Sequence, residues 1–245
     1  MGKFYPVLGG VEKVMFDITS GLSETGVECD MMCATSDGRG SEVIELNPHG
    51  RVVCCKTWLK KARTTIAPSM ITKLRRMADG YDIIHIHHPD PMAAMALMLS
   101  GFRGKVVLHW HSDILSQKTL LKFYLPIQNW LIKRADAIVG TSPVYLAESP
   151  YLQKVQDKTR CIPIGIVPNR SDSAKVQSIR NEYAGRKIIF SLGRLVEYKG
   201  YRYLIEAAKY LDDSHIILIG GGGPLKDELQ SQIDGLEVGN RVKLL

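Results

Sequence analysis

The sequence predicts an α/β protein built from two doubly wound domains with parallel sheets. Short apolar runs of strand length alternate along the chain with amphipathic helical stripes. Several runs, including residues 83–86 and 216–219, are apolar on both faces, as parallel strands covered by helices must be. Glycines and polar side chains follow the ends of these runs, where open parallel sheets bind their ligands.

The apolar runs predict six strands in a first domain and three in a second. The first series covers residues 27–33, 51–57, 82–87, 105–110, 137–141 and 159–163. The second covers residues 187–192, 214–220 and 242–245. Only Lys3, Phe4 and Tyr5 precede Pro6, so we expect the opening strand of the first domain to be nearly absent.

Helical periods lie between the predicted strands. One stripe runs from Val11 to Leu22 and is followed by Gly26, where a C-cap glycine belongs. Others run from Leu121 to Ile132 and from Tyr201 to Leu211, and Pro224 opens a helix over residues 225–233. Residues 164–185 hold glycine, proline, serine and mixed charge without a sustained stripe, and this predicts a linker. The domains are therefore expected at residues 1–163 and 186–245, the second with an incomplete sheet.

Composition restricts the classes of partner. A net charge of +7 favours an anionic partner, such as a nucleotide or a phospholipid surface. Nucleic acid is disfavoured because no aromatic side chains are interleaved with the basic ones. We expect weak docking on an anionic membrane through the basic residues Lys60, Lys61, Arg63, Lys73, Arg75 and Arg76.

The cysteines and the hydropathy pattern indicate a cytoplasmic protein, peripheral on the inner face of the membrane if it docks there. The five cysteines include no C-x-x-C pair and are expected to be free thiols in a reducing compartment. No apolar run approaches the roughly 20 residues that a membrane-spanning helix needs.

Histidines mark the ends of two predicted strands. His85 and His87 share one face of the first strand, and His109 and His111 share one face of the next. A lone histidine at a strand end is commonly structural, whereas two adjacent strands that end in this way favour a binding site. Asp113 follows the second strand.

Glycines and cations mark the other candidate positions. Gly9 and Gly10 stand directly before the first helix, where backbone amides can approach a phosphate or simply form a turn. Arg194 and Lys199 follow the first strand of the second domain and suit a diphosphate, although a solvated loop would have the same composition. Gly221 and Gly222 lie in a glycine run of low specificity.

Taken in order, these segments resemble glycosyltransferase family 4, the group 1 glycosyltransferases of GT-B fold. The most specific stretch is Phe-Ser-Leu-Gly-Arg-Leu-Val-Glu-Tyr-Lys-Gly at 190–200. It is supported by Gly-Gly-Val-Glu at 9–12, by Tyr-Asp-Ile-Ile-His-Ile-His-His at 81–88 and by His-Trp-His-Ser-Asp at 109–113. The glycine turn at 220–223 completes the pattern, so the resemblance covers essentially the whole chain.

The resemblance implies a retaining transferase that acts in cell-surface polysaccharide synthesis. Such an enzyme moves a hexose-type sugar from a nucleoside-diphosphate sugar to a glycan or lipid-linked acceptor. It implies no metal and no other cofactor. Arg194 and Lys199 match the cations that hold the donor diphosphate, and Gly9 and Gly10 match the loop facing the donor. His111 and Asp113 are the expected catalytic residues. His111 matches the histidine near the transferred sugar, and Asp113 is expected on the acceptor side. His85, His87, His109, Gly221 and Gly222 are expected to contribute to substrate binding.

The sequence also departs from the family pattern. The family carries a Glu-x7-Glu motif late in its second domain, and no two glutamates here stand eight positions apart. Gly165-Ile166 is followed by Val167 where the family has aspartate. One alternative is therefore a C-terminally truncated, inactive relative that binds ligand weakly. A remote alternative is a metal-dependent hydrolase using His109, His111 and Asp113, although Ile114 stands where its signature requires histidine.

Overall fold

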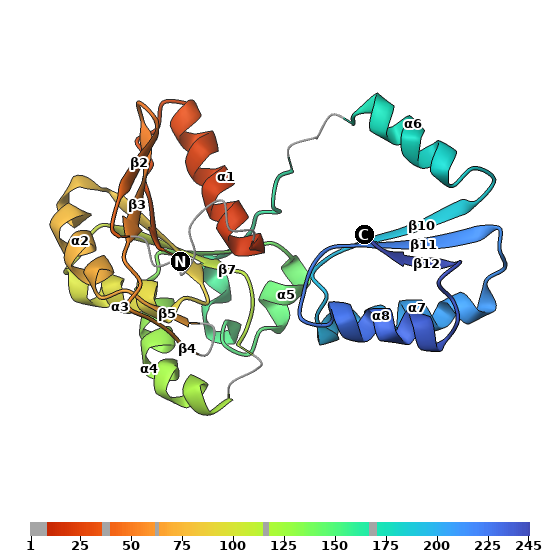
Figure 1. The fold of residues 1–245 in the computed structure, drawn as a ribbon. Helices are drawn as coiled ribbons and strands as arrows, with labels where there is room; N and C mark the ends of the chain where they lie inside the picture. The colour runs from red at the N-terminus through yellow and green to blue at the C-terminus, as the bar shows by residue number, and fades with distance from the viewer. Residues whose placement is uncertain (1–8, 36–39, 62–63, 115–117, 167–170) are drawn as a thin grey trace. The chain divides into compact units, whose positions relative to one another are not determined.

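The computed structural model describes residues 9–35, 40–61, 64–114, 118–166 and 171–245. The chain divides into two compact units, Met1–Ile166 and Val167–Leu245 (Figure 1). Each unit is of α/β type and contains a sheet of adjacent parallel strands, which confirms the predicted fold class. The opening strand expected near Lys3 lies outside the described residues.

The first unit contains two main sheets. One has the order β1-β3-β2, and the other has the order β6-β7-β8-β9 with all neighbours parallel. Their strands are β1 (Met31–Ala34), β2 (Val43–Asn47), β3 (Gly50–Cys55), β6 (Ile83–His88), β7 (Lys105–Trp110), β8 (Ala137–Gly140) and β9 (Thr159–Cys161). The five helices described in this unit are α1 (Gly10–Glu24), α2 (Ser69–Met77), α3 (Pro91–Ser100), α4 (Lys118–Arg134) and α5 (Pro143–Glu148). Short 3-10 turns occupy Ala78–Gly80 and Gln153–Lys158.

Antiparallel pairing corrects the expectation of parallel strands throughout. Strand β2 pairs antiparallel with β3, and β4 (Leu59–Lys61) forms an antiparallel hairpin with β5 (Thr64–Ile66). Strand β2 was not predicted because it is short and mostly half-exposed, so it lacks an apolar run.

Local sequence signals explain the boundaries of α1 and α3. Gly26 adopts a φ of 86° after α1, and the amide of Val27 donates to the Leu22 carbonyl in a Schellman-type end. Asp90 caps α3 by accepting from the amides of Met92 and Ala93, and Pro91 occupies the first helical position.

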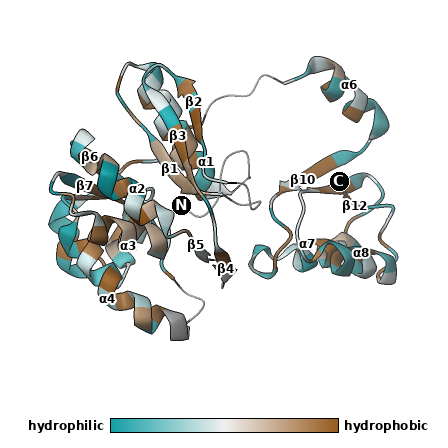
Figure 2. Ribbon diagram, turned by 60° about the vertical axis from the view of Figure 1, so that its left-hand side comes forward, coloured by the Kyte–Doolittle hydropathy of each residue, from teal (hydrophilic) through white to brown (hydrophobic). Residues whose placement is uncertain are grey.

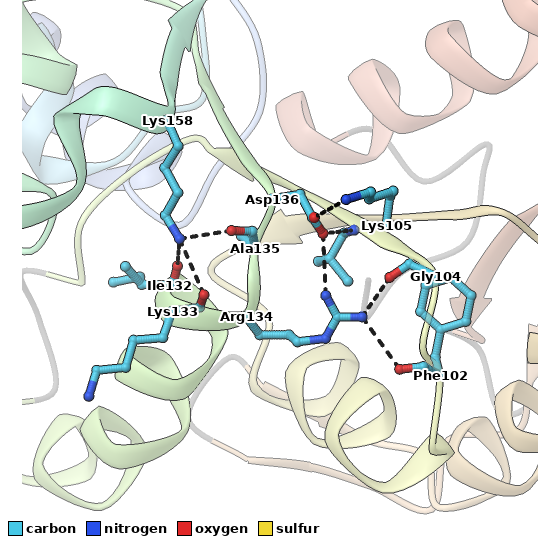
Figure 3. Close-up of polar contacts among 10 residues, drawn as sticks. Phe102, Gly104, Lys105, Ile132, Lys133, Arg134, Ala135, Asp136 and Lys158 are labelled. Carbon is cyan, nitrogen blue, oxygen red and sulfur yellow. Dashed lines mark hydrogen bonds and ion pairs between the residues drawn. The ribbon is translucent and has the colours of Figure 1, made fainter.

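A network of charges ties together the amino ends of β7 and β8 (Figure 3). The Asp136 carboxylate accepts from Lys105 Nζ at 2.8 Å and from the Val106 amide at 2.9 Å. Arg134 donates to the same carboxylate at 3.3 Å and to the Gly104 carbonyl at 2.6 Å. Lys158 donates to carbonyls at the end of α4, including that of Ile132 at 2.7 Å. These polar groups stabilise the sheet at the end away from its histidines.

The second unit is a small sheet with the order β10-β11-β12. Its elements are α6 (Ser173–Glu182), β10 (Lys187–Leu192), a 3-10 turn (Glu197–Lys199), α7 (Tyr201–Ala207), a 3-10 turn (Ala208–Tyr210), β11 (His215–Gly220), α8 (Lys226–Gly235) and β12 (Val242–Leu244). Helices α7 and α8 lie together on one side of the sheet (Figure 1). The hydrophobic β10, brown in Figure 2, leaves Phe190 and Leu192 exposed.

The segment predicted as a linker contains a helix. Residues 173–182 form α6, and Tyr183 directly after it packs in a buried cluster with Ile216 and Leu218 of β11. Helix α6 was not predicted because it buries none of its residues and so shows no apolar stripe. The latter part of the segment therefore belongs to the second unit.

Candidate functional site

Four histidines form a ladder at the carboxyl ends of β6 and β7. His87 and His109 are partners in the parallel register, and His85 and His111 extend the ladder on the same face. The ring centroids of His87 and His109 lie 5.1 Å apart, and those of His109 and His111 lie 4.1 Å apart. The structure thus brings together His85, His87, His109 and His111, which alternation along the strands had placed on common faces.

The histidine ladder is electrically neutral near neutral pH. Burial lowers the pKa of His85 and of His111 to about 4. Burial also lowers the pKa of His87 and of His109. A low-dielectric surrounding disfavours the protonated ring, and neighbouring rings would repel a second charge. Neutral imidazoles can exchange hydrogen bonds with sugar hydroxyls, but they supply no positive charge for a phosphate.

His111 lies at the outer end of the ladder and is only partly buried. Its Nε2 is 2.9 Å from Nδ1 of His87, and its backbone amide donates to the carbonyl of His88. These two contacts fix both the ring and the backbone after β7. His111 is therefore the member of the ladder best placed to present a fixed, neutral imidazole to a ligand.

Asp113 holds the loop after β7 in place. Its Oδ1 accepts from Trp110 Nε1 at 2.8 Å and from Ser149 Oγ at 2.9 Å, and its amide donates to the Tyr145 hydroxyl. With Oδ1 engaged twice by protein donors, the carboxylate acts on the position of the loop. These contacts position the loop, and the catalytic or acceptor-side role expected of Asp113 stays a prediction.

The ladder offers three candidate metal ligands, because nitrogens of His85, His87 and His109 lie within 4.8 Å of one another. Their rings are stacked, however, and the planes of His85 and His109 differ by only 7°. A ring nitrogen directs its lone pair in the ring plane, so stacked rings do not aim their lone pairs at a common point as tetrahedral zinc requires. Asp113 is committed to Trp110 and Ser149. The arrangement does not fit the hydrolase alternative.

Two exposed cations follow β10 in the second unit. Arg194 and Lys199 have no ion pair or side-chain hydrogen bond with any residue that the structure describes. The nearby carboxylate of Glu197 is paired instead with Arg202, at 2.7 Å. Gly200 ends this loop with a φ of 68°. The loop therefore presents two unneutralised positive charges at the carboxyl end of a parallel strand, where an anion would be stabilised.

The glycine turn after β11 packs against this loop. A Cβ on Gly221 would lie 2.1 Å from the carbonyl oxygen of Gly193, and one on Gly223 would lie 2.3 Å from that of Leu195. The amide of Leu195 donates to the Gly222 carbonyl at 2.9 Å. Gly221 is therefore required for backbone packing, whereas a Cβ on Gly222 would meet nothing within 4 Å and this position is open to a ligand.

Gly9 and Gly10 begin the first helix. Gly9 is the N-cap of α1, and a Cβ there would lie 1.9 Å from a carboxylate oxygen of Glu12. Gly10 has open space around it. Because Glu12 places negative charge at this helix end, it opposes a phosphate at the same position. Gly10 is therefore open as a point of backbone access, whereas at Gly9 only the movable end of the Glu12 side chain lies close.

Two residues that support the site were not found from the sequence. His88 is fully buried and stacks on Trp110 with centroids 3.8 Å apart. Ser149 reaches Asp113 from 36 residues away, and no local pattern indicates such a contact.

Two family profiles match the chain. The profile described as Glycosyltransferase Family 4 matches residues 8–170, and the one described as Glycosyl transferases group 1 matches residues 172–245. The chain belongs to this glycosyltransferase family. The family assignment predicted from the sequence is therefore confirmed, and GT-B is the fold of its structural neighbours.

Relatives and solved structures agree with the family assignment. The O-antigen chain mannosyltransferase C of Escherichia coli is 32% identical over 94% of this chain and 61% of its own length. The D-rhamnosyltransferase WbpZ of Pseudomonas aeruginosa is 29% identical over 95% of this chain and 61% of its own. A structure of Anabaena Alr3699/HepE in complex with UDP superposes with a TM-score of 0.68 at 21% identity, covering 99% of this chain and 67% of that one. This glycosyltransferase-family chain thus spans about three fifths of the length of those two relatives.

Within the described part of this glycosyltransferase-family chain, no helix has both the length and the apolar character needed to cross a membrane.

Proposed function

We propose that this chain carries the donor-diphosphate contacts of a retaining glycosyltransferase that acts in cell-surface polysaccharide synthesis. The donor would be a nucleoside-diphosphate sugar of hexose type, and the acceptor a glycan or a lipid-linked sugar. Two relatives are named for mannosyl and rhamnosyl transfer, and HepE has been solved with UDP and with UDP-glucose.

The unpaired cations Arg194 and Lys199 carry this proposal. A departing nucleoside diphosphate gains negative charge as the sugar leaves, and a positive charge already in place stabilises it without reorganisation. Arg194 would bind two phosphate oxygens through its planar guanidinium, and Lys199 would act as a point charge. Because both cations come from the protein, we propose that transfer needs no metal ion.

The histidine ladder supports the sugar end of the proposal. His111 is held by His87 and by the backbone of His88, and burial keeps its ring neutral. Because Nε2 of this ring is engaged by His87, Nδ1 is the nitrogen that would donate to or accept from a sugar hydroxyl. We assign His111 to the transferred sugar, with His85, His87 and His109 holding it in register.

Thermal-shift measurements with UDP, GDP and ADP test the donor site. We expect at least one diphosphate to raise the Tm of the parent chain, because a ligand that binds only the folded state stabilises it. Arg194→Ala and Lys199→Ala should each lose most of that shift. Lys209→Ala is the matched control, because Lys209 is paired with Glu206 on the same unit. An equal shift in the parent and in both site variants would contradict the assignment.

A second candidate function is ligand binding without transfer. No two glutamates in this chain have the spacing of the family's Glu-x7-Glu motif. The resemblance implies that this motif contacts the sugar and the nucleotide ribose. We expect this chain to bind a diphosphate while turning over slowly or not at all. Robust transfer of radiolabelled sugar by the 245-residue protein would refute this expectation.

Weak attraction to an anionic membrane belongs to the same proposal. Arg75 and Arg76 are exposed at the end of α2, while Lys73 donates to the carbonyl of Cys54 at 2.9 Å. Co-sedimentation with phosphatidylglycerol vesicles at low salt should exceed that with phosphatidylcholine vesicles. Equal sedimentation with the two kinds of vesicle would contradict docking on an anionic membrane.

A further inference from the structure

A tyrosine side chain reaches into the loop that carries the two unpaired cations. Tyr201 begins α7, directly after that loop, and is only 6% exposed. Its ring packs in the core cluster of the second unit, together with Leu195 and Ile205. The hydroxyl stands at the far end of this ring, so the packing of the core fixes where the hydroxyl lies.

Gly193 shows where the hydroxyl of Tyr201 points. This glycine lies between β10 and Arg194. A Cβ on Gly193 would lie 2.6 Å from Oη of Tyr201 and 4.0 Å from Cε of Lys199. The phenol oxygen therefore fills the space that the missing side chain of Gly193 leaves free. That space lies at the carboxyl end of β10, beside the side chain of Lys199.

The hydroxyl of Tyr201 keeps its hydrogen-bonding capacity. It has no hydrogen bond with any residue that the structure describes, and its oxygen is not among the fully enclosed polar atoms. The hydroxyls of Tyr81 and Tyr145 differ, because they bind the Asp30 carboxylate and the Asp113 amide. A hydroxyl offers one donor and two acceptor positions, so the one on Tyr201 can bind a ligand that enters the loop.

Packing of the core explains the ring of Tyr201 but not its hydroxyl. Phenylalanine would fill the same place in the cluster and would relieve the close approach to Gly193. Beside a buried ring the hydroxyl also loses part of its hydration, and no described residue compensates for that loss. An oxygen in these surroundings is explained when a ligand supplies its partner.

We propose that the Tyr201 hydroxyl donates a hydrogen bond to a phosphate oxygen of the nucleoside diphosphate held by Arg194 and Lys199. This inference rests on the donor site of the proposed function. An ionised phosphate oxygen only accepts, and a hydrogen bond to an ionised acceptor is about twice as strong as one between neutral groups. The ring of Tyr201 is already fixed, whereas the two exposed cations lose side-chain freedom on binding. The hydroxyl therefore orients the diphosphate, while the cations supply the charge.

Isothermal titration with the nucleoside diphosphate that stabilises the parent chain most tests the inference. Tyr201→Phe should weaken binding by about tenfold, the loss expected for a hydrogen bond to a charged group. Its Tm without ligand should stay close to that of the parent, because no hydrogen bond within the protein is removed. Tyr210→Phe is the matched control and should bind as the parent does, since Tyr210 is 86% exposed beyond the far end of α7.

A double-mutant cycle with Gly193→Ala separates the hydroxyl from general damage to the loop. In the parent chain the added methyl group would displace the hydroxyl, so Gly193→Ala should weaken binding by about tenfold as well. In Tyr201→Phe that contact is absent, and the methyl group would lie 3.8 Å from Cζ of the ring, an ordinary contact. Gly193→Ala should then cause little further loss, and the two changes should be non-additive.

Two results would overturn the inference. One is equal affinity of Tyr201→Phe and the parent chain, and the other is a fully additive loss when Tyr201→Phe and Gly193→Ala are combined. Arg194→Ala separates this failure from failure of the donor site. If Arg194→Ala weakens binding and Tyr201→Phe does not, only the role of the hydroxyl is wrong. If neither variant weakens binding, or if no diphosphate binds the parent, the donor site and the inference are both wrong.

Discussion

Polar side chains at the two ends of the parallel strands differ in whether the protein supplies their hydrogen-bond partners. At the amino ends of β7 and β8, Asp136 binds Lys105, Arg134 and the Val106 amide, so its charge is compensated. At the carboxyl ends of β6 and β7, the side-chain nitrogens of His109 have no hydrogen-bond partner among the residues described.

The second unit repeats this contrast with two arginines that flank the same strand. Arg186, just before β10, donates to the carbonyls of Asp213, His215 and Asn240 at 3.0, 2.6 and 2.8 Å. Arg194, just after β10, makes no such bond to the described residues. Arg186 at the amino end of β10 therefore stabilises the fold, whereas Arg194 at its carboxyl end is left available for a ligand.

Acidification should produce the largest effect, because it charges the buried histidines. Burial lowers the pKa of His85 in the folded chain to about 4, below its ordinary value of 6.5, so the unfolded chain binds the proton more readily. The stability from this residue is complete above pH 6.5 and is lost as the pH falls toward 4, by about 3 kcal/mol at most. Urea denaturation from pH 7.5 to 4.5 measures it. His85→Gln should lessen the loss, and an unchanged pH dependence would contradict the burial of a neutral ring.

Arg186→Ala should destabilise the second unit by about 2 kcal/mol, since it removes donors from three backbone carbonyls. Denaturant unfolding followed by hydrogen exchange in β11 would register this loss. Arg194→Ala is the matched comparison and should change stability by less than about 0.5 kcal/mol. Similar losses of stability in the two variants would contradict the difference between the amino and carboxyl ends of β10.

Asp113 should tolerate an amide but not a methyl group. In Asp113→Asn the side-chain oxygen can still accept from Trp110 and Ser149, so stability should fall by less than about 0.5 kcal/mol. Asp113→Ala removes both acceptors and should cost about 1 to 2 kcal/mol. Thermal unfolding with tryptophan fluorescence compares them. Equal losses in both variants would show that charge, rather than hydrogen bonding, holds this loop.

His88→Phe should have the smallest effect and should not lower stability. His88 is buried against Trp110, and neither ring nitrogen has a partner in the described ranges. Phenylalanine keeps the stacked ring and removes two unsatisfied polar atoms, so a gain of up to about 1 kcal/mol is expected. A loss of stability measured by urea denaturation would indicate that His88 has a polar partner in the folded protein.

The strands that could be predicted from the sequence are those with continuous apolar runs. Strands β7 and β10 were predicted with the observed bounds because their apolar runs are continuous. Helix α3 was missed because it is apolar nearly all round and shows no stripe, although Asp90, Pro91 and Gly101 mark its ends.

Only those residues of the candidate site that directly follow a strand could be predicted from the sequence. The positions of Arg194 and of the histidines follow from the alternation of strands and helices. The role of Asp113 depends on Ser149 from a distant helix end, and the need for Gly221 depends on the backbone of Gly193. Contacts of this kind arise from tertiary packing, which local patterns do not encode.

Diphosphate affinity in the two arginine variants tests the central claim most directly. Isothermal titration with the preferred nucleoside diphosphate should show Arg194→Ala weakening binding by about tenfold or more, the expected loss of a charge-assisted hydrogen bond. Arg186→Ala, measured at a temperature where it remains folded, should bind as the parent chain does. Equal weakening in both variants, or none in either, would contradict the claim that the carboxyl end of β10 is reserved for the ligand.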